Sequence, residues 1–325
     1  MREELTEAYI RQVWDTLPQK VKPTTFQSTF LLKQALGADV TIASETLQVT
    51  GSFKFRAAYN LLALVEQDEV ITASSGNFGQ AVAYACMLLG KRCTVVMPLT
   101  SSKTKQAAIR AYGGEIELLD VAITSRMQRM DEIREEHPNA FIAPPYDHYR
   151  VVAGNSTLGK EIIERLHTPT APLDYIVCPI GGGGLISGIV VARDLLAPEI
   201  EVIGAEPLLG NDAAQSLRTG TLQSLDHEPQ TMADGTRTLS VGNLNWEIIR
   251  DGLKRIIEVP EEKIAEGVRL LYATANLKAE PTGALSPGAV LTQPELFKGK
   301  RVCLVVSGGN VDVETYARVL SMADK

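Results

Sequence analysis

Apolar segments of two kinds alternate along the chain. Short runs that are apolar or nearly so predict buried strands at 70–74, 93–98, 115–119, 141–146, 175–180, 201–206 and 301–306. Apolar residues three and four positions apart predict helices at 3–17, 57–67, 80–90, 104–114, 122–136, 153–167, from the glycines after 180 to about 196, and at 261–279. Strands apolar throughout that alternate with helices are typical of parallel sheets covered on both faces. The stretch 207–245 has no clear period, and long irregular segments are often functional.

Length and charge narrow the class of protein. A chain of 325 residues predicts two domains or one large one. A net charge of −7 argues against a nucleic-acid-binding surface. No run of about 18 apolar residues predicts a membrane span, and the start has no signal-peptide pattern. The four cysteines lack CxxC spacing and are expected as buried thiols in a reducing cytosol. We therefore expect a cytoplasmic globular protein.

Three predicted strands end in small polar residues: Ser74–Gly79, Gly181–Gly184 and Ser307–Asn310. In open parallel sheets, ligands bind beyond the carboxyl ends of strands, and a helix that starts there favours an anion. Four consecutive glycines suit a phosphate, because no side chain separates the backbone N–H groups from it. Two alternatives stay open: a tight turn, and a dinucleotide site in which Gly182, Gly184 and Gly188 approximate GxGxxG and Glu206 binds a ribose.

Lys54 lies in the segment GSFKFRAAYN, after a capping-type serine, Ser52, and just before a predicted helix. The positive end of a helix and the apolar neighbours Phe53 and Phe55 are expected to lower the pKa of this lysine. The alternative is an ordinary solvated lysine at a helix start. An amine of lowered pKa is a good nucleophile for Schiff-base chemistry. Together with a phosphate loop and a serine-rich loop, it indicates pyridoxal phosphate (PLP) as cofactor.

With these segments in view, the chain resembles the fold type II PLP enzymes of the serine/threonine dehydratase and serine racemase family. The resemblance runs from about residue 47 to 320 and rests on TGSFKFRAAYN, SSGNFGQAVAYA, GGGGLISG and VSGGNVD, with GAEP, ADGT and EPTGA in order. It implies an α/β fold of two open parallel-sheet domains covered by helices, tryptophan synthase β-like, with the cofactor in the interdomain cleft. The large PLP-binding domain is expected at 1–61 and 148–325, and a small, mobile, substrate-closing domain at 62–147.

The resemblance also implies roles for single residues. Lys54 would bind the cofactor aldehyde and move protons on one face, and Ser75 would act as a second base on the other face or as a carboxylate donor. The expected cofactor-binding residues are Phe53, Lys54, Asn77, Gly181, Gly182, Gly183, Gly184, Leu185, Gly235, Glu280, Ser307 and Gly308. The expected substrate-binding residues are Ser74, Ser75, Gly76, Asn77 and Phe78. Glu206, Gly210 and Asp212 match a divalent-cation loop for Mg²⁺ or Ca²⁺; the alternative is a strand-end acid and a turn aspartate.

The implied reaction is that of an ammonia-lyase. Lys54 would remove the Cα proton of a β-hydroxy amino acid such as threonine or serine, the hydroxyl would leave as water, and a 2-oxo acid and ammonia would follow. Ser307 at the pyridine nitrogen favours this elimination, because a serine does not hold a proton there as a carboxylate would. The alternatives are an amino-acid racemase, a β-replacement synthase, or a non-catalytic or NAD-binding protein. A homodimer is expected, with no nucleic-acid or membrane partner.

Several positions depart from the family pattern. Phe78 replaces a usual histidine, Asn155-Ser156 replaces Gln-Gly, and Tyr149 replaces a common proline. These changes are expected near the substrate side chain and the closing surfaces, so we predict that plain L-serine is not the best substrate. Arg126 matches a substrate-near arginine of the racemases, with a helix-surface arginine as the alternative.

Overall fold

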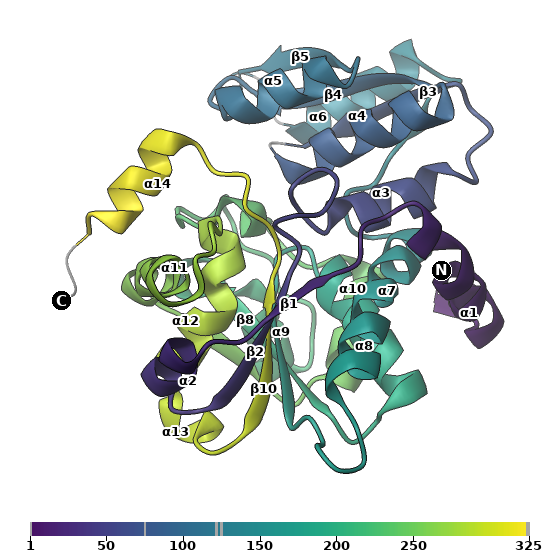
Figure 1. The fold of residues 1–325 in the computed structure, drawn as a ribbon. Coiled ribbons are helices and arrows are strands. Elements are labelled where there is room, and N and C mark those ends of the chain that lie inside the picture. The colour runs from purple at the N-terminus through teal and green to yellow at the C-terminus, as the bar shows by residue number, and fades with distance from the viewer. Residues whose placement is uncertain (1, 75, 121–122, 124–125, 323–325) are drawn as a thin grey trace.

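Two separate sheets, both rich in parallel strands, form the framework of the molecule (Figure 1). The computed structural model describes residues 2–74, 76–120, 123 and 126–322. Within them the large sheet has six strands in the order β1-β2-β10-β7-β8-β9, and the small sheet has four in the order β5-β4-β3-β6. All neighbours pair parallel except β1, which runs antiparallel to β2. The α/β architecture with two parallel sheets is confirmed.

The elements have the following bounds. The strands are β1 Thr25–Gln27, β2 Asp39–Ser44, β3 Glu69–Ala73, β4 Arg92–Pro98, β5 Glu115–Leu119, β6 Phe141–Ile142, β7 Tyr175–Pro179, β8 Glu201–Pro207, β9 Ile256–Val259 and β10 Arg301–Val306. The helices are α1 Glu7–Thr16, α2 Phe30–Leu36, α3 Lys54–Leu62, α4 Asn77–Leu89, α5 Lys103–Ala111, α6 Arg126–Glu136, α7 Tyr149–Leu166, α8 Gly184–Leu196, α9 Asp212–Thr219, α10 Asn243–Gly252, α11 Glu261–Ala275, α12 Leu285–Thr292, α13 Pro294–Phe297 and α14 Val313–Leu320.

Helices cover the large sheet on both faces: α1, α7, α8 and α10 lie on one side, and α2, α11, α12 and α13 on the other (Figure 1). Successive residues of β7 therefore point into two different cores. Ile176 and Cys178 join the core beneath α7 and α8, whereas Val177 joins the core beneath α11 and α12. This explains why the strand is apolar throughout. No helix in the described part of the chain is both long and apolar enough to span a bilayer.

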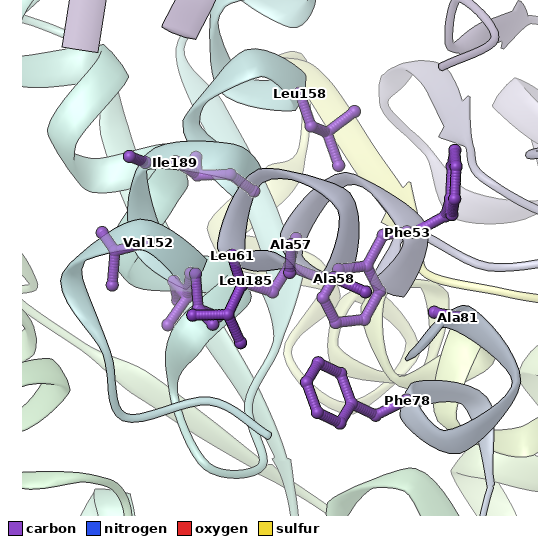
Figure 2. Close-up of a cluster of buried hydrophobic side chains, with 14 of the residues drawn as sticks. Phe53, Ala57, Ala58, Leu61, Phe78, Ala81, Val152, Leu158, Leu185 and Ile189 are labelled. Atoms are coloured by element: carbon purple, nitrogen blue, oxygen red, sulfur yellow. The ribbon is translucent and has the colours of Figure 1, made fainter. Parts of the chain in front are cut away.

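The small sheet is covered in the same way, with α4 and α5 on one face and α6 on the other. On β4, Val95 and Met97 face the α4 side, and Val96 faces Ile133 of α6. Helix α3 lies between the two sheets, and its small residues Ala57 and Ala58 sit in one apolar cluster with Phe78 and Leu185 (Figure 2). The first residue of α3 is thereby held where the two halves of the molecule meet.

Buried charge fixes α3 further. Arg56 is fully buried and donates to Glu45 at 2.8 Å and to Glu161 at 2.7 Å. The two carboxylates compensate for the loss of water around the guanidinium. Gly154 of α7 allows the close approach, because a Cβ there would lie 2.5 Å from the Arg56 carbonyl oxygen. The orientation of Lys54, two residues before Arg56, follows from these contacts.

Several element predictions are corrected by the structure. The helix expected at 57–67 begins at Lys54 and ends at Leu62, and Ser52 does not cap it, because no side chain caps this helix start. The long helix ends at Ala275 because Asn276 adopts a left-handed conformation, with φ of 49°. The stretch 207–245 contains α9 and the start of α10, both short helices that the periodicity missed. Strands β1, β2 and β9 and helices α2, α12, α13 and α14 were also missed.

Candidate active site

One cavity lies at the carboxyl ends of strands from both sheets. Fourteen of the predicted site residues line it: Phe53, Lys54, Ser74, Gly76, Asn77, Phe78, Gly181, Gly182, Gly183, Gly184, Leu185, Gly235, Glu280 and Ser307. The rule that ligands bind beyond strand ends thus brings together segments far apart in the sequence. Gly308 is not among the lining residues, and Ser75 lies outside the described residues.

Lys54 is the amine of this cavity. Its Nζ donates to the carbonyl oxygen of Pro145 at 3.2 Å and lies 5.1 Å from the Phe53 ring centroid and 5.6 Å from that of Phe78. Burial lowers the pKa of Lys54 to about 8, and the charge of Glu280 opposes this only in part. A substantial fraction of the amine is therefore neutral near pH 8, as a nucleophile or base requires.

The glycine loop 181–185 presents donors without acceptors. Among the described residues, no group accepts a hydrogen bond from the N–H of Gly182, Gly183 or Gly184. Gly183 is left-handed, with φ of 89°, and the loop opens α8. Successive N–H groups in such a turn at a helix start form an anion-binding concavity. The loop fits a phosphate group.

The dinucleotide alternative loses its other two residues. Gly188 lies inside α8, where a Cβ would come within 2.7 Å of Asn155 on α7, so this glycine serves helix packing. Glu206 is absent from the cavity lining, and its carboxylate accepts from the N–H groups of Ala213 and Ala214 at 3.1 and 2.9 Å. Neither residue is available to a nucleotide bound at the glycine loop.

Ser307 supplies a second unsatisfied group. It follows β10, and its buried Oγ has no hydrogen-bond partner among the described residues. Such a hydroxyl at a cavity fits a ring nitrogen that would accept a hydrogen bond from it. The carbonyl oxygen of Ser307 accepts from the Phe53 N–H at 3.0 Å, which ties the lysine segment to the strand end. The cavity thus has hydrogen-bond donors for the phosphate and the ring nitrogen of PLP and an amine for its aldehyde.

The loop after β3 opens α4. The Ser74 Oγ accepts from the N–H groups of Gly76 and Gly79 at 3.2 and 3.1 Å. The Asn77 amide donates to Glu280 at 2.6 Å and accepts from Asn310 at 2.9 Å, so both ends of this side chain are engaged. Its predicted bond to the ring oxygen of the cofactor stays a prediction.

Two of the predicted site residues, Phe78 and Glu280, give the cavity an apolar wall and a carboxyl of raised pKa. Phe78 is buried and lines the cavity as an apolar wall, with its ring, like that of Phe53, near the Lys54 Nζ. Burial raises the pKa of Glu280 to about 7, while the nearby ammonium of Lys105 opposes that rise. Ordinary glutamates are ionised well below this value.

The sequence reasoning missed several lining residues, among them Lys105, Tyr146 and Asp234. Lys105 is buried, and its Nζ lies 2.7 Å from Asp234 and 4.0 Å from Glu280, so it joins α5 to the large-sheet side. The ring of Tyr146 lies against Gly182, where a Cβ would meet its Cγ at 2.2 Å. Lys105 and Tyr146 follow β4 and β6, so the rule about strand ends could have found both.

The predicted metal residues lie apart from the cavity lining. Burial raises the pKa of Asp212 to about 7 and, with the charge of Asp212, raises that of Glu206 well above its usual range. The Asp212 carboxylate accepts from the Val241 N–H at 2.9 Å, and Gly210 ends the short turn before it. Within the described residues, no three His, Cys, Asp or Glu side chains gather as a metal cluster. Two close carboxylates still suit one hard cation.

The departures from the family pattern have local partners. The Asn155 Nδ2 donates to the Gly184 carbonyl at 2.9 Å. The Ser156 Oγ accepts from the Trp14 indole at 2.8 Å and so anchors α1 on α7. Tyr149 stacks on His148 with ring centroids 4.7 Å apart. The Arg126 side chain lies outside the described residues.

Fold and cavity together define an enzyme with a half-buried lysine of lowered pKa and a phosphate loop. The family model described as "Pyridoxal-phosphate dependent enzyme" matches residues 17–308. The chain belongs to this family of PLP-dependent enzymes, and its cofactor is pyridoxal phosphate.

Two curated relatives and two solved structures are similar to this chain over most of its length. The serine racemase of Schizosaccharomyces pombe is 39% identical over 288 residues, 87% of either chain. The L-threo-3-hydroxyaspartate ammonia-lyase of a Pseudomonas species is also 39% identical, over 87% of this chain and 88% of the relative. A threonine deaminase from T.th. superposes with a TM-score of 0.88 at 35% identity, covering 94% of this chain and 99% of that one. Maize serine racemase superposes with a TM-score of 0.88 at 31% identity, covering 96% of this chain and 95% of that one.

Proposed function

We propose that this protein is a PLP-dependent ammonia-lyase that converts a β-hydroxy amino acid to a 2-oxo acid and ammonia. One observation carries the proposal: a neutral-prone lysine lies in one cavity with an unsatisfied phosphate loop and an unsatisfied serine hydroxyl. The relatives named as ammonia-lyases of hydroxyaspartate and threonine support the same reaction class.

Bound PLP supplies an electron sink that makes the Cα–H of the amino acid acidic. Lys54, as the neutral amine, takes the Cα proton. The N–H groups of Asn77 and Phe78 at the start of α4, together with the hydroxyl of Ser74 as donor, bind the substrate carboxylate. Ser307 leaves the ring nitrogen without a full positive charge, which favours prompt loss of the β-hydroxyl. Ser75 remains a prediction as second base or carboxylate donor.

A racemase is the second candidate, because relatives of similar identity carry that name. The two functions differ in product. Incubating the enzyme with single L-amino acids and measuring both 2-oxo acid and D-amino acid separates them. Formation of D-amino acid without 2-oxo acid would sink the lyase proposal.

The apolar wall formed by Phe78 bears on the substrate. It replaces a polar side chain of the family with buried apolar bulk beside Lys54. We expect β-hydroxy amino acids with larger side chains to react with a higher kcat/KM than L-serine, because serine leaves this surface uncovered. A steady-state comparison of serine, threonine and larger analogues tests this, and a clear preference for serine contradicts it.

Lys54→Ala tests the central claim. The wild-type holoenzyme should show the visible absorption band of lysine-bound PLP and release 2-oxo acid, and the variant should lose both. Lys103→Ala is a matched control, since Lys103 is exposed on α5. A wild-type protein without the band, even after addition of PLP, refutes the proposal.

We further propose the domain division into 1–61 with 148–325 and the mobile small domain 62–147. All strands of the small sheet lie within 62–147, and the cavity lies between the two groups of elements. Spectroscopic distance measurements with and without a substrate analogue test closure over the substrate. An unchanged separation of the two labelled units contradicts it.

We also propose a homodimer in the cytoplasm. Exposed apolar side chains on α2, α11 and α14 (Phe30, Leu31, Tyr272 and Val313) support an interface, and the four free buried thiols suit a reducing compartment. Sedimentation equilibrium tests the assembly: a mass of one chain at micromolar concentration contradicts the dimer. Fractionation of the source cells tests the compartment.

Glu206, Gly210 and Asp212 are proposed as an Mg²⁺ or Ca²⁺ site. Burial raises the pKa of Asp212 to about 7 and that of Glu206 well above its usual range, so the folded protein binds more protons than the unfolded chain above about pH 4, and stability falls as pH rises from there. A cation removes this penalty. Added Mg²⁺ should therefore raise the melting temperature more at pH 8 than at pH 6, and no increase at either pH contradicts the site.

A further inference from the structure

We infer that Asn155 and Asn245 are positioning residues that hold the glycine loop 181–185 with its N–H groups turned toward the phosphate of PLP. The inference rests on the proposed function, since it concerns the same cofactor site. Neither side chain lines the cavity, so both act through the loop. They come from α7 and α10, two helices that flank the start of α8.

Asn245 contacts the first part of the loop. Its Nδ2 donates to the Gly182 carbonyl oxygen at 2.7 Å and to the Tyr146 carbonyl oxygen at 3.1 Å. The side chain is fully buried. The N–H of Gly242, one turn earlier, donates to the same Gly182 oxygen at 3.1 Å. This carbonyl is therefore fixed on the side of α10.

Asn155 contacts the last part of the loop. Its Nδ2 donates to the Gly184 carbonyl oxygen at 2.9 Å, and the residue is 1% exposed. Between the two, the Gly183 carbonyl accepts from the N–H of Ser187 at 3.0 Å, inside the first turn of α8. Three successive carbonyls thus have partners in the protein.

Peptide geometry turns these contacts into an orientation of donors. In a trans peptide, the C=O of one residue and the N–H of the next point in opposite directions. Fixing the carbonyls of Gly182 and Gly184 into the protein therefore directs the N–H groups of Gly183 and Leu185 away from it, toward the cavity. The loop is then organised before the phosphate arrives, which lowers the entropy lost on binding.

The donor is the part of each amide that matters. The Oδ1 atoms of Asn155 and Asn245 are buried without a hydrogen-bond partner among the described residues. Burying such an oxygen is unfavourable, and a leucine of similar size would avoid it. Rotating either amide would place its oxygen against a carbonyl oxygen. The hydrogen bonds from the two NH₂ groups to the loop carbonyls therefore explain why asparagines stand at these positions.

Asn245 also joins the phosphate loop to the lysine. The Tyr146 carbonyl that it binds follows Pro145, whose carbonyl accepts from the Lys54 Nζ at 3.2 Å. The Tyr146 ring lies on Gly182. One amide therefore sets the spacing between the anion site and the amine, the two points where PLP must be held at once.

The test compares PLP with pyridoxal, the same aldehyde without the phosphate. The full-length protein, stripped of cofactor, is titrated with each compound, and the band of the lysine-bound form is followed. In Asn245→Leu and Asn155→Leu, the Kd for PLP should rise about tenfold or more, because a buried carbonyl loses its donor, while the Kd for pyridoxal stays within about twofold.

Asn60→Leu is the matched control. Asn60 is a buried asparagine whose Nδ2 donates to the Arg150 carbonyl at 2.7 Å, away from the loop. This variant should change neither the Kd for PLP nor the Kd for pyridoxal. If the loop variants raise both dissociation constants equally, or neither, the positioning role is overturned. Should one loop variant fail to fold, the other decides by the same ratio. A wild-type protein that binds neither compound refutes the proposed function instead.

Discussion

The loop after β7 and the loop after β3 both place backbone N–H groups at the start of a helix, α8 and α4, yet different contacts hold them. The carbonyls of the glycine loop are held by Asn155, Asn245 and Gly242, all on the large-sheet side, while the Tyr146 ring that lies on Gly182 comes from the 62–147 unit. The loop after β3 is joined to that side through Asn77, which contacts Glu280 and Asn310. Lys105 of α5 adds a contact to Asp234.

The difference separates two tasks. Contacts within one unit keep their geometry if the two units move relative to each other, whereas contacts across the cavity do not. The coenzyme loop is thus suited to permanent occupation. The loop after β3 is suited to a substrate that enters and leaves, because its position depends on interactions that opening would break.

Gly182→Ala should have the largest effect on the coenzyme side. The new Cβ would lie 2.2 Å from the Cγ of Tyr146, in a loop whose carbonyls are already fixed. Overpacking at such a position costs about 1–3 kcal/mol, so we expect coenzyme affinity to fall by that amount. Titration of the stripped protein with PLP measures it. If the variant binds PLP as tightly as the wild type, the Tyr146 ring and the glycine loop adjust easily, and the glycine loop is not rigid.

Lys105→Met should affect the substrate side. It removes the cation 2.7 Å from Asp234 while keeping most of the buried volume. We expect the KM for the amino acid to rise about tenfold, as for loss of a charge-assisted hydrogen bond, with PLP affinity unchanged. Steady-state kinetics at saturating PLP give the answer, with Lys103→Met, exposed on the same helix, as control. A loss of PLP affinity without a change in KM would reverse the assignment of Lys105.

The pH dependence of PLP attachment to Lys54 tests the coenzyme site further. The pKa of Lys54 is lowered to about 8 by burial, so the neutral amine grows tenfold per pH unit below that value and levels off above it. The rate at which the stripped protein attaches PLP should follow this curve between pH 6.5 and 9.5. Stopped-flow absorbance measures the rate. A profile still rising at pH 9.5 would mean an ordinary, solvated lysine.

What the sequence could predict follows the same division. The alternation of apolar runs and the strand-end glycines are local patterns, and they were enough to locate the sheets, Lys54, the glycine loop and Ser307. The contact of Lys105 with Asp234 joins positions 129 residues apart and depends on how the two sheets are placed. No local period encodes such a pair.

The missed elements have a similar origin. Helix α9 has eight residues, and its buried face consists of Asp212, Ser216 and two alanines, so it contains few large apolar residues for a sequence pattern to detect. Strand β9 has four residues, and β2 begins with an exposed Asp39. These elements form because the neighbouring strands and helices cover them, which is tertiary context rather than propensity.

Gly76→Ala is the smallest expected effect and the matched partner of Gly182→Ala. Here the nearest atom to the new Cβ is the Nζ of Lys105 at 3.1 Å, the free end of a flexible side chain that can shift by a few tenths of an ångström. We expect PLP affinity to change by less than about 0.5 kcal/mol and KM to rise only a few-fold, because the shift loosens the contact with Asp234 without removing it. The same titration and kinetics used for Gly182→Ala apply. If the two alanine variants weaken PLP equally, the two loops are equally rigid, and the separation into a fixed coenzyme site and an adjustable substrate site is wrong.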